Sequence, residues 1–220
     1  NVTANTNGIN DDDGMPLTFN NWKWLKCDTS DGVFVEITDA TSDSYTIPDD
    51  QSLVDKFIKV TAVSTDQRGE TTNVSSISYR VVNVEDEATG NITIGIAQEG
   101  ETVTAVLNNV TDLDGLDTIV YQWQIRDDTN SDYSDLVDES NQSYNIASDQ
   151  SQVGKLIRVK VTTSDNYGGT TDFYSDEQEI ENVDDEATGT ITISGNVEEG
   201  GTITAVLNNV TDLDGLDTIV

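Results

Sequence analysis

Aspartates at recurring positions are the side chains of this sequence whose type and spacing could do chemistry. They lie in two nearly identical segments of twenty residues, ETVTAVLNNVTDLDGLDTIV at 101–120 and GTITAVLNNVTDLDGLDTIV at 201–220. The sequence is therefore a stretch of a tandem array, and each copy carries the same acidic group. The aspartates of the first copy are Asp112, Asp114 and Asp117, and those of the second are Asp212, Asp214 and Asp217.

A second set of acids recurs in two short octets, NVEDEATG at 83–90 and NVDDEATG at 182–189. Each octet has no large hydrophobic residue after its valine and ends in glycine, which is typical of a linker. The linker acids are Glu85, Asp86 and Glu87 in the first octet and Asp184, Asp185 and Glu186 in the second. Glu99 is also matched, by Glu199, and turn-like segments contain Asp149 and Asp165.

Oxygen ligands of this kind indicate a hard metal ion. The sequence has no histidine and one cysteine, Cys27, so softer nitrogen and sulfur ligation is scarce. Ca²⁺ fits best, because it accepts six to eight oxygens in irregular geometry, whereas Mg²⁺ prefers a tighter octahedron and keeps its waters. The segment at 112–123 is not an EF-hand, since its glycine comes two residues early and its twelfth residue is Trp123.

A structural alternative applies to all of these aspartates. Asp and Asn side chains in turns accept hydrogen bonds from their own backbone and tolerate unusual dihedral angles. This alternative is stronger for Asp117 and Asp165 than for Asp112, Asp114 and the linker acids, and it stays open at the sequence level.

The apolar pattern predicts the elements that must position the acids. Between the linkers the apolar period is two, as in Ile92, Ile94 and Ile96, and no helical period is sustained. Expected strands lie at 92–96, 103–107, 118–126, 143–146, 156–162 and 171–180, which favours an antiparallel β-sandwich of about seven strands. The predicted organisation is a module at 1–82 without its first strand, a linker at 83–90, a complete module at 91–181, a linker at 182–189 and the start of a third module at 190–220.

In such a sandwich the strands alternate in direction, so the loops divide between two ends. Asp112, Asp114, Asp117 and Asp165 are expected at the leading end, where the chain arrives from the linker, and Glu99 and Asp149 at the trailing end. Stacked modules would then bring eight carboxylates to one joint. At about 4 Å, each pair of like charges repels by roughly 1 kcal/mol in water and by more in a partly buried joint, so the joint should attract cations.

The composition excludes several classes of function. The formal net charge is −32, from 42 acidic and 10 basic residues, which disfavours nucleic acids and anionic membranes as partners. No apolar run is long enough to insert into a membrane. An enzyme is not expected, because no histidine is present, the cysteine has no base partner and no phosphate-binding glycine loop occurs. Trp22 and Trp24 align with Trp123 and Ile125 and are expected to pack in the core rather than to stack on sugars.

Both octets, the run DLDGLDTIVYQWQ and the stretch at 152–155 resemble bacterial immunoglobulin-like and cadherin-like tandem repeats of giant secreted RTX-type adhesins. The resemblance implies an all-β fold of tandem antiparallel β-sandwiches in a linear array. It also implies calcified joints, in which Glu99, the linker acids 184–186 and the pair Asp212 and Asp214 match the ligand positions of cadherins. One departure is that Thr89 and Thr188 stand where the family's linker has proline.

These observations predict a structural extender repeat of a large extracellular bacterial surface protein or adhesin, stiffened by Ca²⁺ at its joints. Near identity between copies favours a spacer over a recognition surface. An extracellular location is expected because weak Ca²⁺ sites fill outside cells. The expected partners are neighbouring repeats of the same chain. Two alternatives remain: a segment of a filament of identical chains, and an adhesion module that binds a glycan.

Overall fold

The computed structural model describes residues 1–12 and 17–216, and every regular element among them is a β-strand. The predicted all-β fold class is therefore confirmed. The chain divides into two compact units, Asn1–Asp86 and Glu87–Val220. No helix among the described residues is long and apolar enough to span a membrane.

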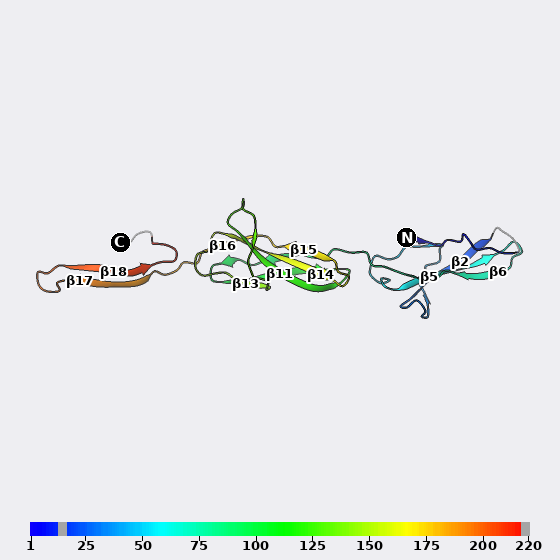
Figure 1. Ribbon diagram of the computed structural model, residues 1–220, viewed down its shortest axis with the longest axis horizontal. Helices are drawn as coiled ribbons and strands as arrows, with labels where there is room; N and C mark the ends of the chain where they lie inside the picture. Colours follow the sequence, from blue (N-terminus) through cyan, green and yellow to red (C-terminus); the bar gives the residue numbers. More distant parts are fainter. Residues whose placement is uncertain (13–16, 217–220) are drawn as a thin grey trace. The chain divides into compact units, whose positions relative to one another are not determined.

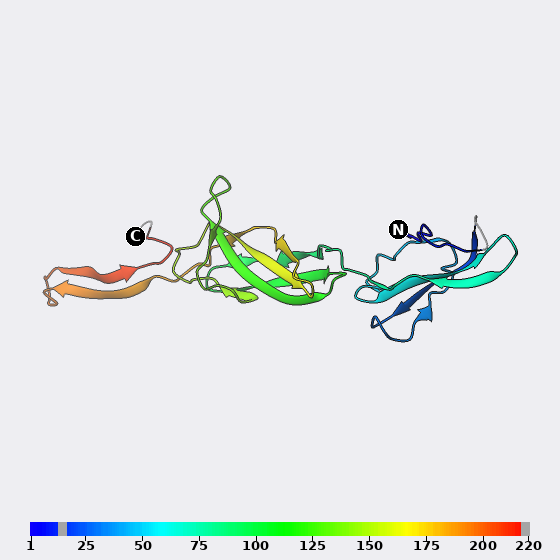
Figure 2. The same cartoon turned by 45° about the vertical axis from the view of Figure 1, so that its right-hand side comes forward.

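The second unit contains a β-sandwich, here called the middle module, in which an antiparallel sheet faces a larger sheet that is antiparallel except for the parallel pair β9 and β16. One sheet has the order β13-β10-β8, and the other has the order β12-β11-β14-β16-β9, with β15 also paired to β14. Figures 1 and 2 show the long strands β11 and β14 side by side. The smaller sheet consists of β8 (Thr89–Ile94), β10 (Thr102–Thr111) and β13 (Ser143–Asn145). The larger consists of β9 (Ala97–Gln98), β11 (Leu116–Arg126), β12 (Ser134–Asp135), β14 (Leu156–Asp165), β15 (Thr170–Tyr174) and β16 (Gln178–Glu181).

The core of the middle module lies between these sheets. Period-two alternation places every second residue of β14 inside, and Ile157, Val159 and Val161 are fully buried. Trp123 is also fully buried, and its Nε1 donates a hydrogen bond to the Asn141 carbonyl at 3.0 Å. Burial of the indole ring thus leaves its polar group satisfied, as expected for a core tryptophan.

Three details of the predicted strands are wrong. The run at 171–180 is two strands, because the Ser175 hydroxyl accepts a bond from the Val159 amide and interrupts the regular ladder. Ile96 is 70% exposed, because β8 ends at Ile94 and the chain then crosses to the other sheet, where β9 pairs in parallel with β16. The linker octets also end earlier than predicted, since β8 starts at Thr89 and β17 at Thr188.

The first unit has the same plan with a smaller core. Its strands are β1 (Val2–Thr3), β2 (Thr18–Cys27), β3 (Val35–Glu36), β4 (Ser44–Tyr45), β5 (Phe57–Thr65), β6 (Thr71–Ser75) and β7 (Tyr79–Arg80). β1 pairs with β4, and β2, β3, β5, β6 and β7 form the second sheet. The buried core residues are Trp24, Ala40, Leu53, Ile58 and Val81.

The predicted alignment of the tryptophans is also wrong. Trp24, not Trp22, is the counterpart of Trp123: its Nε1 donates to the Ser42 carbonyl at 3.0 Å, and it lies opposite Val60 as Trp123 lies opposite Val159. The shift arises from an irregularity in the pairing of β2 between Asn20 and Lys23, where Asn21 has a φ of 51°. Trp24 and Trp123 are therefore core residues, as expected, whereas Trp22 is half-buried.

After the second linker, β17 (Thr188–Gly195) and β18 (Ile203–Thr211) form an antiparallel hairpin, seen in Figure 1. This hairpin has the register of β8 with β10, including the same pairing shift: between Asn108 and Thr111 in β10, and between Thr188 and Thr190 in β17. The loop after β18 carries Asp212 and Asp214 as the loop after β10 carries Asp112 and Asp114.

Candidate functional site: carboxylates at the ends of the middle module

The trailing end of the middle module brings together three carboxylates, here called the trailing group: Glu99, Asp185 and Asp214. Each offers one oxygen, and the three oxygens lie within 4.8 Å of one another. Glu99 follows β9, Asp185 belongs to the second linker and Asp214 to the loop after β18. Residues 115 positions apart in the sequence thus share one site, because β9 ends beside the linker that follows β16.

Gln150 holds two members of the trailing group. Its backbone amide donates to Glu99 Oε1 at 2.8 Å, and its side-chain Nε2 lies 2.9 Å from Glu99 Oε2 and 2.6 Å from Asp214 Oδ1. The backbone amide of Asp185 donates to Asp214 Oδ2 at 2.6 Å. Both carboxylates are therefore oriented by neutral donors.

Burial and like charge dominate the electrostatics of the trailing group. Glu99 is 4% exposed, and no lysine or arginine among the described residues forms an ion pair with any of the three acids. Desolvation raises the pKa of Asp185, and repulsion from Glu99, Asp214, Asp212 and Asp184 raises it further. Hydrogen bonds from the Asp185 amide and then from the Asn182 and Gln150 side chains lower the pKa of Asp214. The trailing group is a concentration of negative charge without a protein cation.

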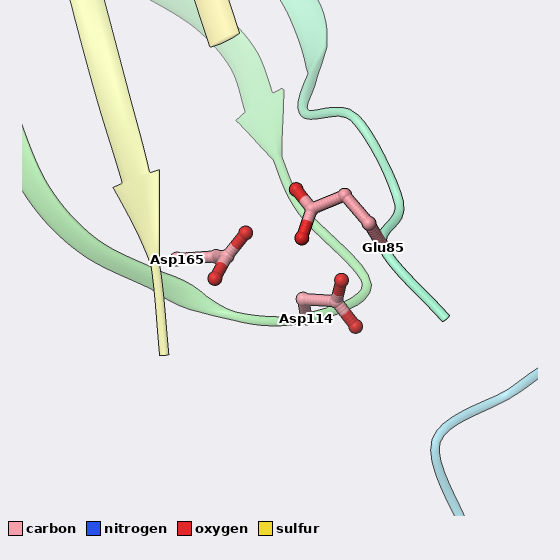
Figure 3. A group of neighbouring side chains, drawn as sticks. All are labelled: Glu85, Asp114 and Asp165. Carbon is pink, nitrogen blue, oxygen red and sulfur yellow. The ribbon is translucent and has the colours of Figure 1, made fainter. Parts of the chain in front are cut away.

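A second group, the leading group, lies at the opposite end of the middle module. Asp114 and Asp165 are 3% and 5% exposed, and together with the linker acid Glu85 they offer oxygens within 4.8 Å of one another. Figure 3 shows the three carboxylates as neighbours. The pairing of Leu116 with Asp165 brings the loop after β10 beside the end of β14.

Turns fix the two aspartates of the leading group. One oxygen of Asp165, Oδ1, accepts from the backbone amides of residues 167, 168 and 169 at 2.5, 2.7 and 3.1 Å. The side chain of Asn166 donates to the Asp114 carbonyl at 3.1 Å. Asp165 therefore combines the turn role with a place in the group, so the two alternatives drawn from the sequence do not exclude each other.

The donor chemistry of both groups fits Ca²⁺. All six side chains are carboxylates, which are hard oxygen ligands, and each group carries a formal charge of −3 when ionised. In each group the buried aspartate or glutamate could bind an ion directly, and backbone carbonyls and water could complete six to eight oxygens.

Other predicted ligands lie outside the two groups. Asp112 and Asp212 accept bonds at 2.7 and 2.9 Å from the amides of Asp114 and Asp214, and thereby shape the loops. Asp149 is exposed, and bonds from Ser151 lower its pKa. Asp117 is exposed in β11. Four linker acids also belong to neither group, and they are Asp86, Glu87, Asp184 and Glu186. Asp217 lies outside the described residues.

Sequence reasoning missed Gln150 and Asn182, because their side chains are neutral and the pattern of acidic residues does not include them. Their recurrence was the available signal: Gln150 and Asn182 match Gln51 and Asn83 at a spacing of 99 residues. In both copies the glutamine amide donates to the asparagine Oδ1, at 2.6 Å for Gln150 and 3.0 Å for Gln51.

The first unit contains an apolar hollow of about 510 Å³, lined by Val2, Trp22, Trp24, Ile58 and Tyr79 among others. In the middle module the corresponding sheet face is covered by β8, whose Ile92 is 3% exposed. The described part of the first unit has no strand in the place of β8. The hollow therefore corresponds to the space of a strand and gives no support to a sugar site.

No family model and no curated protein matches this sequence. Among solved structures, one match is described as a Ca²⁺-stabilized adhesin that helps an Antarctic bacterium reach out and bind ice, with 18% identity and a TM-score of 0.32. The match covers 70% of this chain and 40% of the adhesin, so the chain spans less than half of that structure. The FN1-FN3 domains of chicken CNTN1 match with 10% identity and a TM-score of 0.29, covering 87% of this chain and 76% of that one. TM-scores of this size establish no relationship with either protein.

Proposed function

We propose that the chain is a structural extender of a large extracellular bacterial surface protein, and that Ca²⁺ stiffens the joints between its modules. The observation that carries the proposal is the presence of a three-carboxylate group at each end of the middle module. A module built to bind one ligand needs one site, whereas a repeating spacer needs a matching half-site at both ends.

The repeat relates the two groups to each other. Asp114 of the leading group and Asp214 of the trailing group occupy the same position of the repeat, 100 residues apart. The leading group adds Asp165 from within its own module, and the trailing group adds Glu99 from the preceding one. A full joint then contains the repeated aspartate, an acid at the position of Asp165 from the following module, an acid at the position of Glu99 from the preceding module, and an acid from the linker. Such a joint has at least four carboxylates, which exceeds what either group shows alone.

Calcium would act by neutralising this charge. Three carboxylate oxygens within 4.8 Å repel one another, and a movement of the linker that takes its acid away would relieve the repulsion. A bound divalent cation reverses the sign of the interaction and holds the linker against the modules. An extracellular location follows from the same reasoning, because Ca²⁺ is plentiful outside the cell.

Calorimetry and small-angle X-ray scattering on the same chain would test this function. In calorimetry, Ca²⁺ should bind with a dissociation constant in the micromolar to millimolar range and should raise the melting temperature of the chain above its value in EDTA. In scattering, the chain should sample a narrower range of maximum dimensions in Ca²⁺ than in EDTA. Mg²⁺ at the same ionic strength is the matched control and should have a much smaller effect. Calorimetry without binding heat and scattering curves identical in Ca²⁺ and EDTA would refute the proposal.

The filament alternative is tested with the same samples. Sedimentation in Ca²⁺ should give a single chain, because the residues of each three-carboxylate group come from one and the same chain. A mass that grows with protein concentration would instead favour a filament of identical chains.

A further inference from the structure

Gln150 is the one neutral side chain that reaches two carboxylates of the trailing group among the described residues. Its Nε2 lies within hydrogen-bond distance of Glu99 Oε2, Asn182 Oδ1 and Asp214 Oδ1. These acceptors belong to the middle module, to the linker and to the loop after β18. A carboxamide has only two N–H hydrogens, so the three acceptors share them.

The backbone at Gln150 is held in an unfavourable conformation. Its φ is 63°, in the left-handed region that costs free energy for residues other than glycine, asparagine and aspartate. In this conformation the backbone amide meets Glu99 Oε1 at 2.8 Å while the side chain turns to the other oxygen. The free-energy cost of this backbone conformation therefore accompanies two hydrogen bonds from Gln150 to Glu99.

A glutamine with a positive φ and a hydrogen bond to the linker also occurs in the first unit. Gln51 has a φ of 60°, and its Nε2 donates to Asn83 Oδ1, as Gln150 donates to Asn182. In each copy a glutamine at the trailing end thus binds the first residue of the following linker. Two independent copies with the same dihedral angle and the same partner indicate a built feature of the repeat.

We propose that Gln150 is a positioning residue of the joint, which holds Glu99 and Asp214 beside each other before a cation arrives. The proposal rests on the proposed function, because it assigns the step that prepares the Ca²⁺ site. When no cation is bound, the amide donors replace part of the missing positive charge. When Ca²⁺ binds, Glu99 and Asp214 are already oriented, so less order has to be gained on binding.

The decisive variant is Gln150→Gly. Glycine adopts a positive φ without strain and keeps the backbone amide, so this variant removes the carboxamide without endangering the fold. Gln51→Gly is the matched control, because it makes the same change at the same φ beside Asn83, away from Glu99 and Asp214. Both variants should melt within a few degrees of the wild type.

Two local readouts test the proposal. In EDTA, the Asp185 amide that donates to Asp214 should exchange its hydrogen roughly tenfold faster in Gln150→Gly, and at the wild-type rate in Gln51→Gly. Titration followed by the NMR shifts of the amides of residues 150 and 185 should give a 10- to 100-fold weaker Ca²⁺ affinity in Gln150→Gly, as for other residues that orient metal ligands.

The outcomes separate this proposal from the proposed function. Wild-type exchange at Asp185 in Gln150→Gly would overturn the positioning role, whatever the Ca²⁺ affinity. A wild-type chain that binds no Ca²⁺ would overturn the proposed function, while the exchange experiment in EDTA would still decide whether Gln150 holds the joint. A residue with a purely structural role would lower the melting temperature equally with and without Ca²⁺ and would leave the affinity unchanged.

Discussion

At the scale of residues, the aspartates of each DLDG loop divide into two roles. Asp112 and Asp212 accept amide bonds within their loops, and those bonds present Asp114 and Asp214 to the neighbouring acids. The spacing of two residues thus places one carboxylate in the turn and the next in the group. The first role supports the second, because the turn fixes the direction of the following side chain.

Replacing Asp214 with asparagine should test the trailing group. Asparagine keeps an oxygen for the Asp185 amide but removes a negative charge, so Ca²⁺ affinity should fall by roughly tenfold or more while the fold is retained. Asp149→Asn is a suitable control, since Asp149 is exposed and bonds to Ser151. Calorimetry on both variants checks the prediction. Equal loss of affinity in the two would mean that bulk charge, not the trailing group, attracts the ion.

Glu177 should make the stability of the fold depend on pH. Hydrogen bonds from Tyr133 and then Arg126 lower its pKa in the folded state, so the folded chain releases this proton more readily than the unfolded chain. The stabilisation is present above the ordinary carboxyl pKa and is lost as the pH falls through the lowered folded value. The free energies of unfolding in urea of the wild type and Glu177→Gln should therefore differ at pH 7, and the difference should disappear as the pH falls below the lowered pKa of Glu177. A difference between the two that does not change with pH would contradict this assignment.

The limits of sequence reasoning are clearest at single residues. The division of loops between two ends predicted Asp114 near Asp165, and Glu99 near Asp185 and Asp214, and the carboxylate oxygens of each set lie within 4.8 Å of one another. The same division predicted eight carboxylates at one joint, whereas three converge in the trailing group and Asp149 accepts hydrogen bonds from Ser151. It missed Gln150, because a neutral amide becomes part of the site only when the fold brings its partners together.

At the scale of elements, the strand that follows each linker is shaped by a close contact between glycine and a bulge. Gly90 has a φ of 129°, and a Cβ there would lie 2.7 Å from Val110 Cα. The opposite strand contains Asn109 with a φ of 50°, where the pairing of β8 with β10 shifts. Gly189 and Asn209 repeat the arrangement with φ values of 129° and 49°. This feature sets how the chain leaves the acidic linker and enters the sheet.

Gly90→Ala should therefore destabilise the middle module. The added methyl group meets backbone atoms that cannot move aside easily, and alanine at this φ is strained, so the loss should be about 1–3 kcal/mol. Gly95→Ala is the matched control, because a Cβ there meets nothing within 4 Å and its φ is not positive. Urea denaturation of both variants measures the difference. Similar stabilities for the two would show that the bulge can relax.

The strand pattern itself was largely predictable, because buried and more exposed residues alternate along a strand that has one face in the core, as in β14. The passage of the chain from one sheet to the other at 95–97 could not be predicted from this pattern. Ile96 continues the alternation of Ile92 and Ile94 but is exposed, since β9 joins the other sheet in parallel with β16. Such a change of sheet depends on contacts 83 residues away, which local periodicity does not contain.

At the scale of the whole chain, repulsion among charges that sum to −32 opposes folding. This repulsion is strongest where the leading and trailing groups bring carboxylates together. General screening and specific binding relieve it differently. Monovalent salt weakens repulsion between exposed charges everywhere, with a screening length that falls from about 30 Å at 0.01 M to about 3 Å at 1 M. A bound divalent ion acts only where oxygens converge.

These two mechanisms predict different salt dependences. In EDTA, raising NaCl from about 0.01 to 1 M should raise the melting temperature steadily, because most of the 42 acids are screened. In millimolar Ca²⁺ the melting temperature at low salt should already be high, and the dependence on NaCl should be shallower. Glu99→Gln combined with Asp214→Asn should restore the steep dependence in Ca²⁺ by removing two of the three trailing carboxylates. If the double variant behaved as the wild type does in Ca²⁺, diffuse ion attraction to the acidic surface would account for the stabilisation, and the trailing group would have no special part in it.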